Sequence, residues 1–362
     1  MIMQKKLIVV KAGTSSLTKE DGSICSKKIR NITDQLCALR NEGHNIVLVS
    51  SGSIAAGFGR LGFSKRPTGV ADRQASAAVG QGLLMEEYTK CLFEHGITCG
   101  QLLLTRGDFS DRRRYKNAFN TISVLMNRGA VPIINENDSI AIDELKLGDN
   151  DTLSAQVAAM LHSDILILLT DIDGLYDSNP SKDKNAKHID VVEEITDELY
   201  SAAGKAGSAN GTGGMITKLR GAALATSAGV PVFICSFKEE NSIVKSVEGT
   251  ARGTLFRAKE GGLKTRLQWM AFYAKISGNL YIDRGAAEAL TQKGKSLLPK
   301  GIVAMEGDFQ KGDVVRVYMQ GSHECIGKGV INYSKGELSM LIKGKENQTE
   351  AIHRDNWVAA GK

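Results

Sequence analysis

A chain of 362 residues is longer than a single hydrophobic core usually serves, so we expect two domains. Its 42% hydrophobic and 24% charged residues exclude an intrinsically disordered protein, and its apolar runs are far too short to cross a bilayer. The six cysteines form no C-x-x-C pair and have no histidine at metal-ligand spacing, so neither a zinc site nor a disulfide framework is predicted. The N-terminus shows no signal-peptide pattern, and we therefore expect a cytoplasmic protein.

Two predicted strands open the chain, and small polar residues follow each of them directly. Residues 7–10 are a continuous apolar run, which is typical of a buried parallel strand, and residues 11–15 (KAGTS) come next. Residues 46–49 form a second such run, followed by residues 50–53 (SSGS). Between the two runs, apolar residues recur at helical spacing after Ser26, which predicts a helix with Ser26 as its N-cap.

The same pattern of strand, polar cluster and helix continues along the chain. A long helix is predicted over residues 70–93, and the apolar run 131–134 leads into residues 135–139 (NENDS). A loop that ends in residues 148–151 (GDND) precedes an alanine-rich helix predicted over residues 152–161. The next strand, 165–169, runs directly into residues 170–174 (TDIDG).

A glycine-rich turn at residues 211–218 (GTGGMITK) leads into a helix predicted to end at Ala228 and carries Lys218 one turn in. Glycines let the backbone approach a ligand closely, and the free N–H groups at a helix start attract an anion, so this turn suits a phosphate. It is not a P-loop, because Thr217 precedes and Leu219 follows the lysine. A mobile surface loop is the alternative that the composition leaves open.

Alternating strands and helices up to residue 235 predict a mainly parallel sheet with helices on both faces, which is a three-layer αβα sandwich. Ligands bind at the carboxyl ends of the strands in such sheets. Because the clusters 11–15, 50–53, 135–139 and 170–174 each follow a strand, we expect one crevice to collect them. As turn formers, the same residues could instead serve only to shape the connections.

After residue 278 the sequence changes to short strand-like runs separated by Gly, Lys and Asp, which predicts a small β-rich domain. We place the domains at residues 1–262 and 277–362, with a connector at residues 263–276. Much of the net charge of +6 lies near this connector, since residues 251–276 carry six positive side chains and one negative. Residues 277–362 carry twelve positive and ten negative side chains, so the basic excess does not belong to a face of the second domain.

In this order the motifs resemble those of the glutamate 5-kinase family, which belongs to the amino acid kinase superfamily and carries a C-terminal PUA domain. The resemblance covers essentially the whole chain. Its carriers are VVKAGTSSL (9–17), SSGSIAAG (50–57), PIINENDS (132–139), GDNDTLSA (148–155), LLTDIDGLY (168–176), GTGGMITK (211–218), SLLPKGI (296–302) and GDFQKGDVV (307–315). Ile216 departs slightly from the pattern, because small polar residues are also seen at its position; we expect the turn to tolerate it.

The resemblance implies an amino acid kinase fold for residues 1–262 and a PUA-like domain for residues 277–362. It also implies transfer of the γ-phosphoryl group of ATP to the side-chain carboxylate of L-glutamate, the first step of proline synthesis. We expect Lys11 and Lys218 to stabilise the transferring group and Asp151 to orient these two lysines. By resemblance, glutamate would be held by Ser51, Asp138 and Asn150, and ATP by Lys11, Thr170, Asp171, Thr212, Gly213, Gly214, Met215, Ile216, Thr217 and Lys218. Mg²⁺ would be carried by the nucleotide, with no metal site formed by the protein alone.

Other readings of the sequence remain open. Other superfamily members act on N-acetylglutamate, aspartate, carbamate or nucleoside monophosphates, although the PUA-like tail and the motifs at 132–139 and 148–155 argue against these substrates. RNA binding by the second domain is a separate alternative, and its support is weak because that domain has a net charge of only +2. The resemblance further implies a homo-oligomer, either a dimer or a tetramer. It also implies inhibition by proline at the glutamate pocket, with residues 135–151 as the candidate segment.

Overall fold

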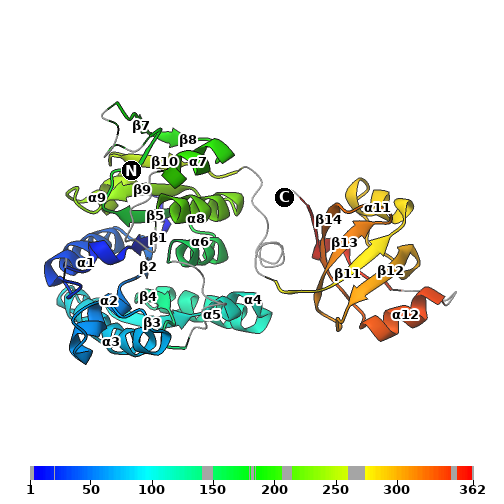
Figure 1. Ribbon diagram of the computed structural model, residues 1–362, viewed down its shortest axis with the longest axis horizontal. Coiled ribbons are helices and arrows are strands. Elements are labelled where there is room, and N and C mark those ends of the chain that lie inside the picture. The colour runs from blue at the N-terminus through cyan, green and yellow to red at the C-terminus, as the bar shows by residue number, and fades with distance from the viewer. Residues whose placement is uncertain are drawn as a thin grey trace. The chain divides into compact units, whose positions relative to one another are not determined.

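The computed structural model describes residues 4–360 except residues 20, 141–149, 179, 181–182, 184, 206–213, 260–273 and 344–348. Contacts within the chain divide it into two compact units (Figure 1). The first consists of residues 1–108 and 116–262, and the second of residues 109–115 and 263–362. No helix in the described part of the chain is long and apolar enough to span a membrane.

The first unit is built on an eight-stranded sheet with the strand order β3-β4-β2-β1-β5-β9-β10-β8. All neighbouring strands from β3 to β9 are parallel, whereas β10 runs antiparallel to β9. In sheet order the strands are β3 (Cys99–Leu104), β4 (Val131–Glu136), β2 (Asn45–Val49), β1 (Leu7–Ala12), β5 (Ile165–Thr170), β9 (Val232–Ser236), β10 (Gly253–Phe256) and β8 (Val191–Val192). The continuous apolar runs of the central strands fit a sheet that is covered on both faces.

Helices cover this sheet on both faces, so the predicted three-layer arrangement is confirmed (Figure 1). The helices of the first unit and of the stretch around residue 110 are α1 (Ser26–Asn41), α2 (Ser53–Phe58), α3 (Val70–Glu94), α4 (Arg106–Ser110), α5 (Arg112–Asn127), α6 (Asn150–Leu161), α7 (Asp197–Lys205), α8 (Met215–Ser227) and α9 (Ser242–Glu248). The prediction of Ser26 as an N-cap is wrong, because Ser26 is the first helical residue and Cys25 is the N-cap. A small two-stranded sheet pairs β6 (Leu175–Tyr176) with β7 (His188–Ile189).

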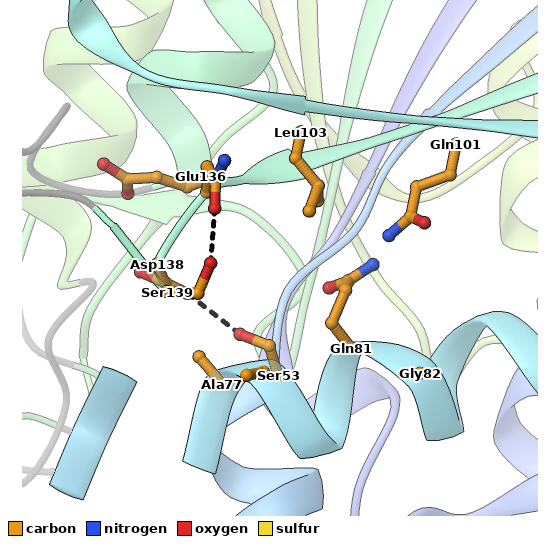
Figure 2. A pocket seen from close by; sticks show the side chains of 11 residues that line it. Ser53, Ala77, Gln81, Gly82, Gln101, Leu103, Glu136, Asp138 and Ser139 are labelled. Carbon is orange, nitrogen blue, oxygen red and sulfur yellow. Dashed lines mark hydrogen bonds between the residues drawn. The ribbon is translucent and has the colours of Figure 1, made fainter. Parts of the chain in front are cut away.

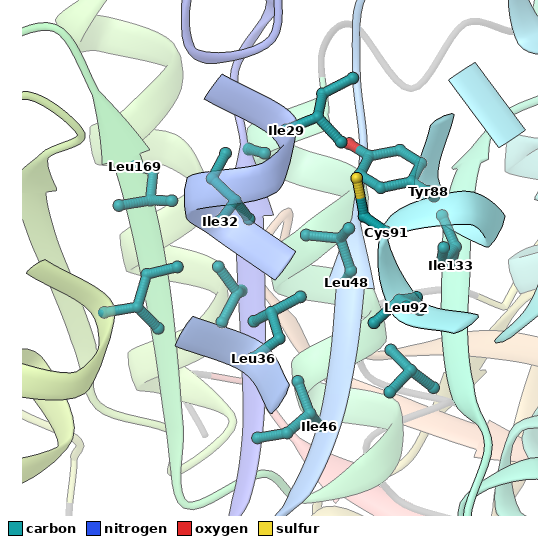
Figure 3. Packing of buried hydrophobic residues seen from close by; sticks show 14 of the residues in the cluster. Ile29, Ile32, Leu36, Ile46, Leu48, Tyr88, Cys91, Leu92, Ile133 and Leu169 are labelled. Carbon is teal, nitrogen blue, oxygen red and sulfur yellow. The ribbon is translucent and has the colours of Figure 1, made fainter. Parts of the chain in front are cut away.

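Strand β1 shows how the sheet divides the apolar core from the polar site. Its even-numbered residues Ile8 and Val10 are fully buried in one apolar cluster with side chains of α1 and α3. Leu36 of α1 and Leu92 of α3 are among the members of this cluster that Figure 3 shows. Successive side chains of a strand point to opposite faces, so Lys11 lies on the other face, where its side chain meets α6. A charged residue can therefore occupy a central strand without entering the apolar cluster.

The second unit has a five-stranded sheet with the order β12-β11-β13-β14-β15 and its own hydrophobic core. The prediction of a small β-rich domain is confirmed. Its strands and helices are β11 (Ile276–Ile282), α11 (Arg284–Thr291), β12 (Ile302–Gly307), β13 (Val314–Met319), β14 (Cys325–Val330), α12 (Lys335–Lys343) and β15 (Trp357–Ala359). Asp283 caps α11 by accepting a hydrogen bond from the Ala286 N–H at 2.7 Å. Leu280 and Phe309 are fully buried in the core of this unit.

Candidate active site

Four polar clusters meet at one edge of the eight-stranded sheet. Strands β4, β2, β1 and β5 are neighbours and parallel, and in register Lys11 lies beside Val49 of β2 and Leu168 of β5. Val49 in turn lies beside Ile134 of β4. The residues that follow these positions therefore emerge at the same end of the sheet, as the alternation of strands and helices predicts.

Asp151 lies between two lysines from distant parts of the chain. Lys11 Nζ is 2.6 Å from Asp151 Oδ1, and Lys218 Nζ is 3.4 Å from Asp151 Oδ2. The hydroxyl of Thr217 also donates to Asp151 Oδ2 at 2.9 Å. Asp151 sits in the first turn of α6, which begins at Asn150 and therefore starts two residues earlier than predicted. An acidic residue is favourable there because it faces the positive end of the helix dipole.

The two lysines keep this buried carboxylate ionised. Burial alone would raise the pKa of Asp151, because a carboxylate loses its hydration. The charges of Lys11 and Lys218 outweigh this effect and lower the pKa from 3.8 to about 2. The side chains of all three residues are at most 8% exposed, and two lysines against one carboxylate leave a formal charge of +1. A buried excess of positive charge of this kind favours the binding of an anion.

Asn150, next to Asp151, ties α6 to the strand ends of β2 and β4. Its Nδ2 group donates to the Ser50 carbonyl at 2.9 Å, to Ser51 Oγ at 2.9 Å and to Asn135 Oδ1 at 3.1 Å. Ser51 is buried, and Gly52 after it has a φ of 87°, a left-handed conformation that favours glycine. The predicted pair Ser51 and Asn150 therefore lies together, and Asn150 shares the first turn of α6 with Asp151.

Asp138, the third residue predicted to hold glutamate, lines a pocket of about 300 Å³ (Figure 2). Its Oδ2 accepts a hydrogen bond from Ser53 Oγ at 2.9 Å, so the start of α2 orients the carboxylate. The pocket is also lined by Ala77, Ala78, Gln81, Gly82, Gln101, Leu103, Glu136, Asn137 and Ser139. Two carboxylates and three amides beside small apolar side chains suit a small polar ligand that carries an ammonium group.

The residues predicted to hold the nucleotide lie at the end of β5 and at the start of α8. Thr170 Oγ1 donates to Asp171 Oδ1 at 3.0 Å, and Gly214 is the N-cap of α8. Met215 and Ile216 are half-buried in the first turn of this helix, whereas Thr212 and Gly213 lie outside the described residues. Among the described residues, no group of three or more His, Cys, Asp or Glu is arranged to hold a metal ion.

Comparison with known proteins agrees with this fold. The sequence pattern of the amino acid kinase family matches residues 6–236, and that of the PUA domain matches residues 278–353. The chain therefore belongs to the amino acid kinase family. It is 55% identical to the glutamate 5-kinase of Streptococcus gordonii over 357 residues, which cover 99% of this chain and 97% of that enzyme. The glutamate 5-kinases of Streptococcus sanguinis and Streptococcus pneumoniae match with the same identity and coverage, so the chain is placed within the glutamate 5-kinase family.

Several contacts of the site were not predicted from the sequence. Thr217 was expected only to hold ATP, yet its hydroxyl bonds Asp151. Asn135 belonged to a predicted polar cluster without a role of its own, and its position directly after an apolar run was the signal that could have identified it. Gln81 gave no signal, because it lies in the interior of α3 and its hydrogen-bond partner Asn135 is 54 positions away.

Proposed function

We propose that this chain transfers the γ-phosphoryl group of ATP to the side-chain carboxylate of L-glutamate. An oxygen of that carboxylate forms a bond to the γ-phosphorus while the bond from this phosphorus to the β,γ-bridging oxygen breaks. ADP leaves, and L-glutamyl 5-phosphate forms. The support is membership of the glutamate 5-kinase family together with a site whose charges suit this reaction.

The observation that carries the proposal is the pair of buried lysines on Asp151. The nucleophile is already an anion, so the reaction needs no general base, but it must bring two anions together. Lys11 and Lys218, with Nζ atoms at 2.6 and 3.4 Å from the oxygens of Asp151, supply positive charge that does not have to be reoriented during the reaction. Asp151 itself is a poor base because its pKa is about 2, so its role is to hold the two lysines.

We assign the glutamate side of the site to Ser51, Asp138 and Asn150. The Asp138 carboxylate, held by Ser53 and facing the 300 Å³ pocket, suits the α-ammonium group of the substrate. Ser51 and Asn150 lie beside Asp151, where a carboxylate approaching the lysines would pass. This arrangement separates recognition of the amino acid from the charges that act on the phosphoryl group.

We assign the nucleotide side to Lys11, Thr170 and Asp171 and to the turn of residues 212–218. The start of α8 directs its free N–H groups toward an anion, and Lys218 follows one turn later. Mg²⁺ would accompany the nucleotide and neutralise part of the phosphate charge. The cytoplasmic location and a homo-oligomeric assembly stay predictions, and RNA binding by the PUA domain stays an alternative with weak support.

The test is ADP release from Mg-ATP with L-glutamate, run with hydroxylamine so that an acyl phosphate is trapped as the hydroxamate. Hydroxamate that forms only with glutamate is the expected result. N-acetylglutamate, aspartate and carbamate serve as competing acceptors, and a higher rate of ADP release with any of them would contradict the proposed substrate. Added proline is expected to raise the apparent KM for glutamate, as a competitor for the same pocket does.

A further inference from the structure

Hydrogen-bonded amide side chains connect helix α3 to the glutamate side of the site. Gln81, which is only 8% exposed, accepts a hydrogen bond from Asn135 Nδ2 through its Oε1 at 2.8 Å. Asn135 Oδ1 accepts from Asn150 Nδ2 at 3.1 Å, and Asn150 Nδ2 also donates to Ser51 Oγ. The connection therefore begins on a helix and ends on two of the residues assigned to glutamate.

Backbone groups at two points determine which way each amide faces. The Glu136 N–H can only donate, and it lies 2.9 Å from Asn135 Oδ1, so Asn135 must direct its NH₂ group toward Gln81. Gln81 must then present its oxygen. The Ser50 carbonyl can only accept, and it lies 2.9 Å from Asn150 Nδ2. The NH₂ end of Asn150 therefore faces β2 and its Oδ1 faces elsewhere.

The orientation of Asn150 leaves its oxygen available to a ligand. Asn150 Oδ1 is buried and has no hydrogen-bond partner among the residues that the structure describes. A buried acceptor without a partner costs free energy, which is recovered when a donor binds. An ammonium or another N–H donor of the substrate can supply that hydrogen bond.

We propose that Gln81 is a positioning residue for glutamate binding, an inference that rests on the proposed function. Its oxygen, together with the Glu136 N–H, holds the Asn135 amide in place, and Asn135 in turn helps to hold Asn150 with Nδ2 on Ser51. Gln81 lines the pocket as well, and it positions Asn150 through Asn135. Without its oxygen, the buried Asn135 NH₂ group loses its acceptor, so the Asn135 side chain can move toward another one and its hydrogen bond to Asn150 weakens.

The test compares Gln81→Met, which keeps the shape of the side chain and removes the acceptor, with Gln81→Glu, which keeps an oxygen at that position. We expect Gln81→Met to raise the KM for glutamate about tenfold while the KM for ATP stays within twofold. Gln81→Glu is expected to keep the KM for glutamate within threefold of the wild-type value. A KM does not depend on how much of the enzyme is folded, so a loss of folded protein alone would not reproduce this pattern.

Gln35→Met is the matched control. Gln35 is a buried glutamine inside α1 whose Oε1 accepts a hydrogen bond from the Ile243 N–H at 2.8 Å, and it does not line the pocket around Asp138. Its replacement is expected to leave both KM values within twofold. If Gln81→Met does not fold, Gln81→Asn, whose shorter side chain does not reach Asn135, replaces it with the same expected result.

If the wild-type enzyme phosphorylates glutamate, any of three outcomes would show that Gln81 is not a positioning residue. They are an unchanged KM for glutamate in Gln81→Met, an equal rise in both KM values, or a Gln81→Glu variant as impaired as Gln81→Met. A wild-type enzyme that forms no glutamate-dependent hydroxamate would instead overturn the proposed function, and the assignment with it.

Discussion

Replacing Lys218 tests the role of its charge in catalysis, because the protein is expected to fold without that charge. If Lys218 is replaced by Met, Asp151 keeps Lys11 at 2.6 Å, so a neutral buried pair remains and the protein is expected to fold. The positive charge for the transferring group is reduced, and removal of one such group costs about 3 kcal/mol of transition-state stabilisation. We expect kcat to fall well over tenfold, measured as ADP release at saturating substrates. Unchanged turnover in a variant with the wild-type melting temperature would remove Lys218 from catalysis.

The low pKa of Asp151 leads to a second prediction, on how the free energy of unfolding depends on pH. Its folded pKa of about 2 lies below the ordinary value of 3.8, so the carboxylate stabilises the folded protein above about pH 4 and this contribution is lost as the pH falls toward 2. The full contribution is about 2 kcal/mol, and about half of it is lost at pH 3. The difference in unfolding free energy between wild type and Asp151→Asn should therefore be constant from pH 6 to pH 5 and about 1 kcal/mol smaller at pH 3, by urea unfolding. A difference that already falls between pH 6 and pH 5 would show that Asp151 titrates well above 2.

Helices α6 and α8 must stay close for Lys218 to reach Asp151, and Gly221 is where they approach. A Cβ atom at position 221 would lie 3.0 Å from the Asp151 carbonyl oxygen, which is tighter than ordinary contact with backbone. Gly221→Ala is therefore expected to push α8 away, to lower kcat about tenfold and to cost about 1–3 kcal/mol of stability. Gly336→Ala in α12 is the control, because its Cβ would meet nothing within 4 Å, it does not line the pocket and alanine favours a helix. Equal kcat values for the two variants would show that the spacing of α6 and α8 does not control the lysine.

The elements themselves were largely predictable, whereas their neighbours in the sheet were not. The runs 7–10 and 46–49 are apolar and β-branched, so local pattern predicts strands there and places Lys11 and Ser51 after them. That β1 lies between β2 and β5, and that β10 turns antiparallel, depends on packing between distant segments that no local pattern encodes. Gln81 could not be identified from the sequence for the same reason. A glutamine inside a helix gives no local sign of its hydrogen-bond partner, which here lies 54 positions away.

At the scale of the whole molecule, the change of sequence pattern after residue 278 correctly predicted a second, β-rich unit. Short runs between Gly, Lys and Asp turns are recognisable because each strand of a small sheet needs only a few apolar residues. The predicted boundaries at 262 and 277 stay a prediction, since residues 260–273 lie outside the described part of the chain.

Two separate hydrophobic cores predict two separable unfolding transitions. Leu36 in the first unit and Leu280 in the second are both fully buried, and replacing either by Ala costs about 2–5 kcal/mol. Each substitution is expected to lower the midpoint of one transition in scanning calorimetry, with the larger shift for Leu280→Ala because its unit is smaller. At 25 °C the KM of Leu280→Ala for glutamate should equal that of wild type, since the residues assigned to the substrate all lie in the first unit. If both substitutions lowered a single common transition by similar amounts, the two units would unfold as one cooperative body, and the predicted connector would not separate independent domains.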